Sequence, residues 1–432
     1  MDLNKIKKVH LIGIGGIGVS ALARLFLNDI KIVTGSDVSE SKVTKGLVDL
    51  GVEVFIGHRA ENLTHGVDLV VYTPAVNENN PEIVEANKLG VPILSYPQAL
   101  GLISMDYSLI AVSGTHGKTT TTAMSAKVLV EANFDPSVVI GSLLKKTQTN
   151  YIAGKSEYLI IEACEYKRSF LNFKPHILII TNIDLDHLDY YKDLADIQSA
   201  FIELVSQMLP DDYLICDVQH KNLEPIVNLA KCQMVNFKTF SKDDLNLKIP
   251  GEHNLENAQC VLALAEVLKI DKQQVIKSLN NFEGTWRRSE YRGKTLTGVK
   301  IYDDYAHNPT EVNATLKGFR DFFPKDKITV IFQPHLYSRT KTFLREFAQS
   351  FDSVDRIIIL PIYAARESFD FSINSEMLAE EIKKYKQEVF FAKDFTSAVF
   401  EIKKNTDIGI IITMGAGDVH QVGESFLENK EY

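Results

Sequence analysis

Short apolar runs alternate with helical patterns along the whole chain. The first run, Val9 to Ile12, is followed by a glycine turn and by a helical pattern near residues 16–27. The pattern restarts at Ser108 to Val112, again with a glycine turn and a helical pattern behind it. Such alternation is typical of α/β units around a parallel sheet, so we expect an α/β fold with mostly parallel sheets.

The runs form three blocks, which we expect to be three domains. Further strand-like runs of the first block lie near 30–34, 52–55, 67–72 and 91–94. The second block has runs near 157–162, 176–181 and 213–216, and helical patterns near 253–268 and 272–280. Runs of the third block lie near 299–302, 327–332, 356–360 and 408–413. We therefore predict domains at 1–105, 106–277 and 278–432.

The first glycine turn has the spacing GxGxxG, from Gly13 to Gly18. Glycines there allow the backbone to approach a phosphate closely, and the N-terminus of the next helix supplies free N–H groups. Asp37 stands 19 residues after Gly18, where a dinucleotide fold binds a ribose. The turn alone fits either a dinucleotide site or a plain strand–helix connection. We expect a Rossmann-like first domain.

The second glycine turn contains Gly117-Lys118-Thr119, although Gly114 precedes Gly117 by only three residues. In a phosphate loop, backbone N–H groups cradle the phosphates, the lysine neutralises their charge and the threonine hydroxyl ligates Mg²⁺. The sequence therefore predicts an ATP site in a central domain that resembles P-loop ATPases.

Acidic and histidine side chains follow two apolar runs of the second block. Glu162 ends one run, and His187 comes seven residues after Ile180, the last residue of the other. Ligands of an open α/β sheet bind outside the carboxyl ends of its strands, so both residues should lie near the phosphate loop. We predict Glu162 and His187 as Mg²⁺ ligands, whereas Asp184 and Asp186 fit capping equally well.

Two further runs offer nucleotide contacts. His253 and Asn257 are four residues apart, on one face of a helical pattern, and could hydrogen-bond an adenine edge. Capping by Asn254 explains the same run. Arg287 and Arg288 directly follow the only tryptophan and suit phosphates, although a solvated basic pair explains this run taken alone.

Polar tips follow three apolar runs of the third block. They are Asp303–Thr310, Gln333–Thr340 and Met414–Asp418. The carboxyl ends of neighbouring parallel strands meet at one edge of a sheet, so we expect these tips to form one binding crevice.

Composition narrows the class of protein. The chain has 432 residues, 24% of them charged, and a net charge of -9, which argues against a general nucleic-acid binder. The four cysteines form no CxxC pair, so a zinc ribbon or a disulfide framework is not expected. Neither a signal peptide nor a run of about 18 apolar residues is evident. We expect a cytoplasmic enzyme, without membrane insertion, as a monomer or homodimer.

These motifs together resemble the Mur ligase family over essentially the whole chain. The motifs, in order, are GIGGIGVSALA (13–23), GTHGKTTTTAM (114–124), EACEYKRSFL (162–171), TNIDLDHLDYY (181–191), GEHNLENA (251–258), FEGTWRR (282–288), DDYAHNPTEV (303–312), FQPHLYSRT (332–340) and MGAGDV (414–419). The resemblance implies a Rossmann-like C-terminal domain. It also implies ATP-dependent joining of L-alanine to the lactyl carboxylate of UDP-N-acetylmuramate, through an acyl phosphate and with Mg²⁺.

The resemblance assigns the three substrates to successive domains. For the UDP-sugar it implies Gly13, Gly15, Gly16, Ile17, Gly18, Ser36, Asp37 and Thr73. For ATP it implies Gly114, Thr115, His116, Gly117, Lys118, Thr119, Thr120, His253, Asn257, Arg287 and Asp304. For the amino acid it implies Tyr305, His335 and Arg339. Catalysis would rest on Lys118, Glu162 and His187, and the metal on Thr119, Glu162 and His187.

The chain departs from the family pattern at three positions. Phe201 stands where other members carry a carbamylated lysine, so Mg²⁺ must be organised without a carbamate, as the alanine-adding branch implies. Asn308 follows His307 where a second histidine is common, and Leu336 follows His335 where arginine is frequent. Arg339 is then the stronger candidate for the carboxylate of the amino acid.

Three alternatives remain open. A murein-recycling ligase would join a preformed peptide to the same UDP-sugar. A NAD-dependent oxidoreductase would explain the first turn and Asp37, but not the phosphate loop. A non-catalytic switch would hydrolyse ATP without either of the other substrates.

Overall fold

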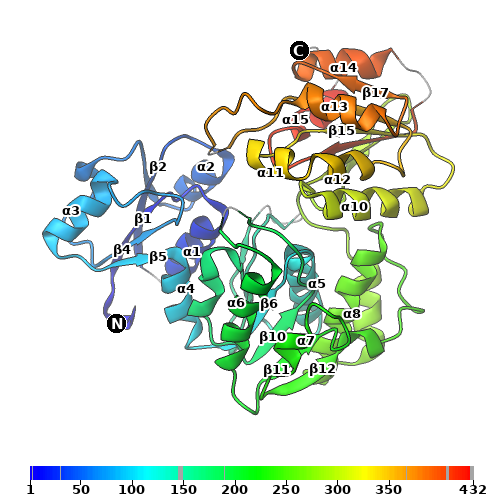
Figure 1. Cartoon of the computed structure of the whole chain (residues 1–432). Helices are drawn as coiled ribbons and strands as arrows, with labels where there is room; N and C mark the ends of the chain where they lie inside the picture. The colour runs from blue at the N-terminus through cyan, green and yellow to red at the C-terminus, as the bar shows by residue number, and fades with distance from the viewer. Residues whose placement is uncertain are drawn as a thin grey trace. The chain divides into compact units, whose positions relative to one another are not determined.

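The computed structural model describes residues 1, 3–29, 31–144, 149–188, 190–365, 367–404 and 408–428 (Figure 1). Contacts between residues divide the chain into two compact units. Unit 1 comprises Met1–Leu245 and Glu256–Asn280, and unit 2 comprises Asn246–Leu255 and Asn281–Tyr432. Within the described ranges, no helix is both long and apolar enough to cross a membrane.

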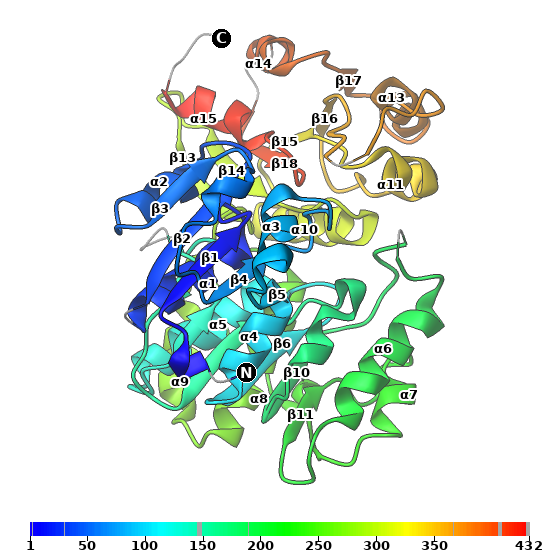
Figure 2. The ribbon, with the colours of Figure 1, turned by 90° about the vertical axis from the view of Figure 1, so that its left-hand side faces the viewer.

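The first sheet of unit 1 has five parallel strands in the order β3-β2-β1-β4-β5 (Figure 2). The strands are β1 (Lys8–Ile12), β2 (Ile32–Asp37), β3 (Glu53–Ile56), β4 (Leu69–Tyr72) and β5 (Ile93–Ser95). The helices between and after them are α1 (Ile17–Asn28), α2 (Lys42–Val48), α3 (Pro81–Leu89) and α4 (Tyr96–Ser104). The strand order reverses at β1, and such a switch point opens a crevice at the carboxyl end of the strand. The first glycine turn lies at this end.

The second sheet of unit 1 has seven strands in the order β12-β11-β10-β6-β9-β7-β8. They are β6 (Ser108–Ser113), β7 (Ser137–Val139), β8 (Tyr151–Ile152), β9 (Tyr158–Glu162), β10 (Ile177–Ile180), β11 (Tyr213–Cys216) and β12 (Gln233–Asn236). Its helices are α5 (Lys118–Glu131), α6 (Leu194–Ser206), α7 (Glu224–Val227), α8 (Glu252–Val267, which begins in unit 2) and α9 (Lys272–Asn280). Only β8 runs antiparallel to its neighbour among these strands. Because β6 lies between β9 and β10, the polar tips of all three strands surround the phosphate loop.

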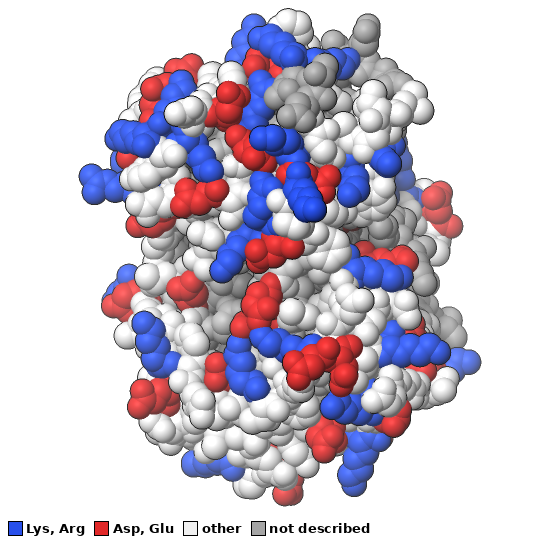
Figure 3. Space-filling model, turned by 90° about the vertical axis from the view of Figure 1, so that its right-hand side faces the viewer, with Lys and Arg blue, Asp and Glu red and all other residues white. Residues whose placement is uncertain are grey.

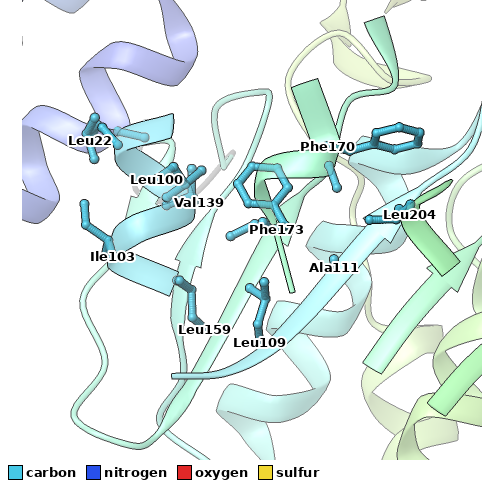
Figure 4. Packing of buried hydrophobic residues seen from close by; sticks show 14 of the residues in the cluster. Leu22, Leu100, Ile103, Leu109, Ala111, Val139, Leu159, Phe170, Phe173 and Leu204 are labelled. Atoms are coloured by element: carbon cyan, nitrogen blue, oxygen red, sulfur yellow. The ribbon is translucent and has the colours of Figure 1, made fainter. Parts of the chain in front are cut away.

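One hydrophobic core joins the two sheets of unit 1. Leu22 of α1 and Leu100 of α4 belong to the same buried cluster as Leu109 of β6 and Leu159 of β9 (Figure 4). Phe201, the residue at the position of the family's carbamylated lysine, is fully buried in this cluster. Both glycine turns therefore belong to one unit with a common core. Phe201 is part of that core.

Unit 2 contains one sheet of six strands, in the order β13-β14-β18-β15-β16-β17. They are β13 (Glu290–Lys294, antiparallel to β14), β14 (Lys300–Asp304), β15 (Ile328–Phe332), β16 (Arg356–Ile359), β17 (Val389–Phe391) and β18 (Ile410–Met414). Its helices are α10 (Pro309–Phe322), α11 (Tyr337–Thr342), α12 (Leu344–Gln349), α13 (Ser375–Lys383), α14 (Phe395–Lys403) and α15 (His420–Glu428). Alternate residues of β18 enter separate clusters: Ile410 and Ile412 enter one, and Ile411 enters the other. Both faces of this sheet are thus covered, as parallel sheets require.

The expected α/β fold with mostly parallel sheets is confirmed. On the face shown in Figure 3, basic and acidic side chains are interspersed. Although the net charge of the chain is -9, this face carries no large patch of acidic side chains alone.

Candidate active site

The phosphate loop connects β6 to α5 and depends on two glycines. Gly114 has a φ of +125° and Gly117 a φ of +81°, the region of backbone conformation that glycine tolerates best. A Cβ atom on Gly114 would collide with the Thr181 hydroxyl, and one on Gly117 with the side chain of Asn257. No side chain caps the N-terminus of α5 at Gly117. The loop therefore presents backbone N–H groups at a helix N-terminus, which is the geometry that binds phosphate.

Lys118 is held at the loop by three acceptors. Its Nζ donates to the carbonyl oxygens of Gly114 at 2.5 Å and Thr115 at 3.0 Å, and to Glu165 Oε1 at 3.0 Å. Burial lowers the pKa of Lys118, but the nearby negative groups, Glu165 first, outweigh it and leave the pKa above its usual value. The lysine is therefore charged and already positioned at the phosphate loop.

Two of the three predicted metal ligands meet directly. Thr119 Oγ1 donates to Glu162 Oε2 at 2.9 Å, and the same oxygen accepts from the Gly141 N–H at 3.0 Å. The third, His187, is joined to this group through Glu165, whose Oε1 lies 3.8 Å from His187 Nε2. The structure thus gathers all three predicted catalytic residues, Lys118, Glu162 and His187, around Glu165 and the loop.

The donor set fits Mg²⁺ bound together with a nucleotide. No group of three His, Cys, Asp or Glu side chains is arranged to hold a metal by itself in the described ranges. Mg²⁺ at phosphate loops takes only one or two protein oxygens and completes its shell with phosphates and water. The Thr119 hydroxyl and the Glu162 carboxylate supply such oxygens.

Turn residues after β10 mainly brace the loop. The His116 N–H donates to Asn182 Oδ1 at 2.9 Å, and the Asp184 N–H donates to Thr115 Oγ1 at 2.8 Å. Asp184 Oδ1 accepts from the Leu185 N–H at 2.8 Å, and Asp186 Oδ1 accepts from the His187 N–H at 2.7 Å. Of the two interpretations left open for Asp184 and Asp186, these contacts favour capping of the turn.

The two predicted adenine contacts fall into different units. Asn257 lies against Gly117 in unit 1, and Thr120 on α5 is buried beside the same loop. His253 belongs to unit 2, where its ring lies over Gly251. Asn257 is thus at the phosphate loop within unit 1.

The first glycine turn is closed by Asp37. The Gly15 N–H donates to Asp37 Oδ2 at 2.8 Å, and Thr73 lies against Gly13, whose φ is +76°. Gly18 has no room for a side chain, because a Cβ atom there would lie 2.8 Å from the ring of Tyr96. The turn, Asp37 and Thr73 are therefore assembled as expected at the carboxyl ends of β1, β2 and β4.

Ser36 has a different place from the one we expected. Its side chain is fully buried, and its hydroxyl contacts Glu82 Oε2 at 2.5 Å and His58 Nδ1 at 2.9 Å. Its carbonyl oxygen accepts from the N–H groups of Gly13 and Ile14. Ser36 therefore shapes the turn from beneath and does not present its hydroxyl to a ligand.

A polar cleft of about 540 Å³ opens beside Thr73 in unit 1. Its lining comes from the end of β4 and the loop after it, from the junction of β5 with α4, and from the 3-10 helix η3 (Tyr166–Asn172). The lining residues are Tyr72, Pro74, Val76, Asn77, Glu78, Asn79, Ser95, Pro97, Gln98, Lys167, Ser169 and Asn172. Amide and hydroxyl groups of this kind suit a sugar or another polar ligand.

In unit 2, the guanidinium of Arg287, a predicted ATP contact, is bonded to protein groups in this conformation. Only 3% of the residue is exposed, and its guanidinium donates to Asp303 at 2.7 Å and to the carbonyl oxygens of Gly415 and Gly417 at 2.5 Å. These bonds tie together the tips of β14 and β18. Its neighbour Arg288 lies over the Tyr305 ring at 5.1 Å and is the more accessible arginine of the pair.

Asp304 is buried at the end of β14. Its Oδ2 accepts from the Ser289 N–H at 2.6 Å, and its Oδ1 from the Ala306 N–H at 2.8 Å. Burial raises the pKa of Asp304 to about 6, although the charge of Arg288 opposes the shift. In this conformation the carboxyl therefore braces the strand tip on which Tyr305 stands.

The predicted amino-acid residues lie together. Arg339 NH1 lies 3.1 Å from His335 Nδ1, and the rings of His335 and His307 are 5.6 Å apart. The ring of Tyr305 is 5.4 Å from that of His307. Asn308 caps α10 by accepting from the Thr310 N–H, so its departure from the family pattern has a local structural role. This cluster thus combines the guanidinium of Arg339, the imidazoles of His307 and His335 and the phenol of Tyr305.

Sequence reasoning missed Glu165 and the polar cleft. Glu165 stands three residues after Glu162 in the same motif, yet nothing in its spacing shows that it pairs with Lys118. The cleft combines segments as far apart in sequence as Tyr72 and Lys167, which no local pattern connects.

The phosphate loop, the glycine turn and the cluster of His335 and Arg339 are the features expected of a nucleotide-dependent enzyme with three α/β domains. Models of one family match it part by part: "Mur ligase family, catalytic domain" at residues 8–108, "Mur ligase middle domain" at 112–246 and "Mur ligase, glutamate ligase domain" at 287–417. The chain belongs to the Mur ligase family, which confirms the resemblance found in the sequence.

Individual relatives cover the whole chain. The UDP-N-acetylmuramate--L-alanine ligase of Clostridium kluyveri is 41% identical in an alignment 454 positions long, which covers 99% of this chain and 99% of that protein. The crystal structure of UDP-N-acetylmuramate-alanine ligase MurC from Thermotoga maritima matches with a TM-score of 0.82 and 30% identity over 98% of both chains. A murein peptide ligase from Psychrobacter arcticus matches with a TM-score of 0.70 and 23% identity over 98% of this chain and 99% of its own, which shows the shared fold.

Proposed function

We propose that this chain joins L-alanine to the lactyl carboxylate of UDP-N-acetylmuramate with ATP and Mg²⁺, in the synthesis of a peptidoglycan precursor. The observation that carries the proposal is the meeting of Lys118, Thr119 and Glu162 at the N-terminus of α5. The full-length similarity to the alanine ligases of Clostridium kluyveri and Thermotoga maritima supports the choice of substrates. ATP is an intracellular metabolite, so the cytoplasm is the expected compartment.

The phosphate loop is the proposed ATP site. Its backbone N–H groups and Lys118 would bind the phosphates, and Thr119 and Glu162 would hold Mg²⁺, with His187 as a third candidate ligand. When bound, Mg²⁺ supplies further positive charge to the phosphate oxygens. Asn257, which lies against Gly117, is the proposed contact to the nucleoside.

The first glycine turn is the proposed site of the UDP diphosphate. The N-terminus of α1 follows Gly16, and no side chain caps it. Asp37 now accepts from the Gly15 N–H, so a diphosphate would share or replace this contact. The cluster at the tips of β14 and β15 is the proposed alanine site, with Arg339 for the carboxylate and His335 and Tyr305 beside it.

The reaction runs in two steps. A lactyl carboxylate oxygen attacks the γ-phosphorus of ATP, ADP leaves, and an acyl phosphate forms. The neutral alanine amine then attacks the acyl carbon, phosphate leaves with the oxygen that bridged carbon and phosphorus, and the nitrogen releases a proton as the amide forms. Lys118 stabilises charge on the transferred oxygens, whereas the guanidinium of Arg339 orients the incoming amine by binding its carboxylate.

A phosphate-release assay tests the proposal. Purified protein is supplied with ATP, Mg²⁺, UDP-N-acetylmuramate and each of the twenty amino acids in turn, and every substrate is also omitted singly. We expect release only with all components, and most rapidly with L-alanine. ATP hydrolysis without the other two substrates would support the switch, and a preference for L-Ala-D-Glu-containing tripeptide would support the recycling ligase.

A further inference from the structure

The ammonium group of Lys118 has no spare donor. An ammonium has three N–H bonds, and three acceptors lie within 3.0 Å of it: the carbonyl oxygens of Gly114 and Thr115, and Glu165 Oε1. A phosphate oxygen can therefore bond to Lys118 only by replacing one of these three.

Of the three, Glu165 is the acceptor that can leave. The two carbonyl groups belong to the loop backbone, which is fixed by the left-handed Gly114 and by the Thr115 N–H bond to the Asn182 carbonyl at 3.0 Å. The Glu165 carboxylate sits on a rotatable side chain. It also carries the same sign of charge as a phosphate, so the two repel each other at one ammonium.

Glu165 is held in place by its surroundings. Only 2% of Glu165 is exposed, and its main-chain oxygen accepts from the Tyr191 hydroxyl at 2.5 Å and from the Arg168 N–H at 2.9 Å. A buried carboxylate is costly without a partner. In the absence of a nucleotide, Lys118 is that partner.

His187 offers the carboxylate a second partner. Its Nε2 lies 3.8 Å from Glu165 Oε1, and Glu165 Oε2 has no hydrogen bond to any residue in the described part of the chain. A small rotation would bring the carboxylate from Lys118 to His187. Carboxylates often orient histidines beside metal sites in this way.

We propose that Glu165 is a displaceable counter-ion of Lys118, which positions the lysine before ATP binds and yields it to the phosphates. Glu165 is thus a positioning residue that lowers the affinity for nucleotide. The inference rests on the proposed function only in taking the phosphate loop as the ATP site.

The test compares Glu165→Gln with the wild type by calorimetric titration of ATP and ADP, once with Mg²⁺ and once in EDTA. Loss of the competing charge-assisted hydrogen bond should tighten ATP binding roughly tenfold in both conditions. In steady-state assays KM for ATP should fall by a similar factor, whereas kcat should change by less than about threefold. Glu165→Asp keeps the charge farther from Lys118 and should give a smaller tightening.

Glu203→Gln is the matched control. It removes the same charge from unit 1, at a half-exposed carboxylate that pairs with Arg168, and should leave nucleotide affinity unchanged. Unchanged or weaker ATP binding by Glu165→Gln would overturn the proposal, and weakening confined to Mg²⁺ would mark Glu165 as a metal ligand instead. If Glu165→Gln does not fold, the same criteria apply to Glu165→Asp. Failure of the proposed function would appear separately, as wild-type protein that binds ATP but releases no phosphate with UDP-N-acetylmuramate and L-alanine.

Discussion

The role of a single residue in the candidate site depends on the residues that surround it in the fold. Lys118 and Glu162 were predictable because a strand, a glycine turn and a helix identify a phosphate loop and its acidic strand end. Arg287 and Arg288 looked alike in sequence, and only the contacts of Arg287 with Asp303 and two carbonyl groups separate them. These contacts join residues that are far apart in sequence, so the local sequence around the two arginines does not predict them.

Replacing Lys118 should affect both rate and stability. Lys118→Ala removes charge stabilisation at the transferred phosphoryl group, so turnover should fall roughly 10³-fold. It also removes the ammonium partner of the buried Glu165 carboxylate, which should lower the free energy of unfolding by about 3 kcal/mol. Phosphate release and chemical unfolding measure the two effects.

The double variant Lys118→Ala/Glu165→Gln separates these effects. It should recover much of the stability but none of the rate. UDP-N-acetylmuramate affinity should match the wild type in both variants. Near-normal turnover of Lys118→Ala would remove the phosphate loop from the ATP site.

Replacing Arg339 should affect the amino acid alone. A guanidinium binds a carboxylate through two parallel bonds, so Arg339→Ala should raise KM for L-alanine roughly 10²-fold and leave KM for ATP nearly unchanged. Arg339→Lys should recover only part of the loss. An unchanged alanine KM in Arg339→Ala, measured at saturating ATP and UDP-sugar, would move the amino-acid site elsewhere.

Asp304 should lower the free energy of unfolding as the pH rises from about 4 to about 6. Its pKa is raised by burial to about 6 in the folded chain, against about 3.9 for an aspartate in an unfolded chain. Between these values the folded state binds more protons, so this carboxyl lowers the free energy of unfolding as pH rises. In urea titrations from pH 4 to 7, the stability of Asp304→Asn relative to wild type should therefore increase with pH. A constant difference across that range would contradict the burial argument.

The sequence predicted most strands, the edge strands β3 and β5 among them, but it missed β7, β8, β12, β13 and β17. The central strands β6, β10 and β15 are mostly apolar and almost fully buried, as expected for parallel sheets. The edge strands β12 (Gln233–Asn236) and β13 (Glu290–Lys294) are largely polar, and β13 contains a bulge near Gly293. Both strands form because they pair with a neighbouring strand. They lack the apolar run from which the other strands were predicted.

The turn between β1 and α1 should be specific for the UDP-sugar. A side chain at Gly15 would put its Cβ 2.9 Å from Asp37 Oδ2 and 3.0 Å from Thr44 Cγ2, so Gly15→Val should displace Asp37 and close the turn. We expect UDP-N-acetylmuramate affinity to fall by more than about tenfold while ATP affinity is kept. Calorimetric titration of both ligands measures this.

Gly46→Ala on α2 is the control, because a Cβ there would meet its nearest atom only at 3.6 Å. It should bind both ligands as the wild type does. Equal loss of both ligands in Gly15→Val would indicate misfolding and leave the turn without a special role.

At the scale of the whole molecule, the three blocks of the sequence correspond to three sheets. The sequence did not predict that the first two sheets share one core, nor that Asn246–Leu255 belongs to unit 2 before the chain returns to unit 1. Both features arise from packing between segments far apart in sequence. The domain boundaries near 105 and 277 therefore stay predictions about folding units.

The central claim is that the carboxylate is activated by phosphoryl transfer and then joined to the amine. It is tested most directly with UDP-N-acetylmuramate that carries ¹⁸O in its lactyl carboxylate, together with ATP, Mg²⁺ and L-alanine. Mass spectrometry of the released phosphate should find one carboxylate oxygen in each phosphate, because the bridging oxygen leaves with phosphorus. Product formation with no ¹⁸O in the phosphate would contradict the acyl-phosphate mechanism.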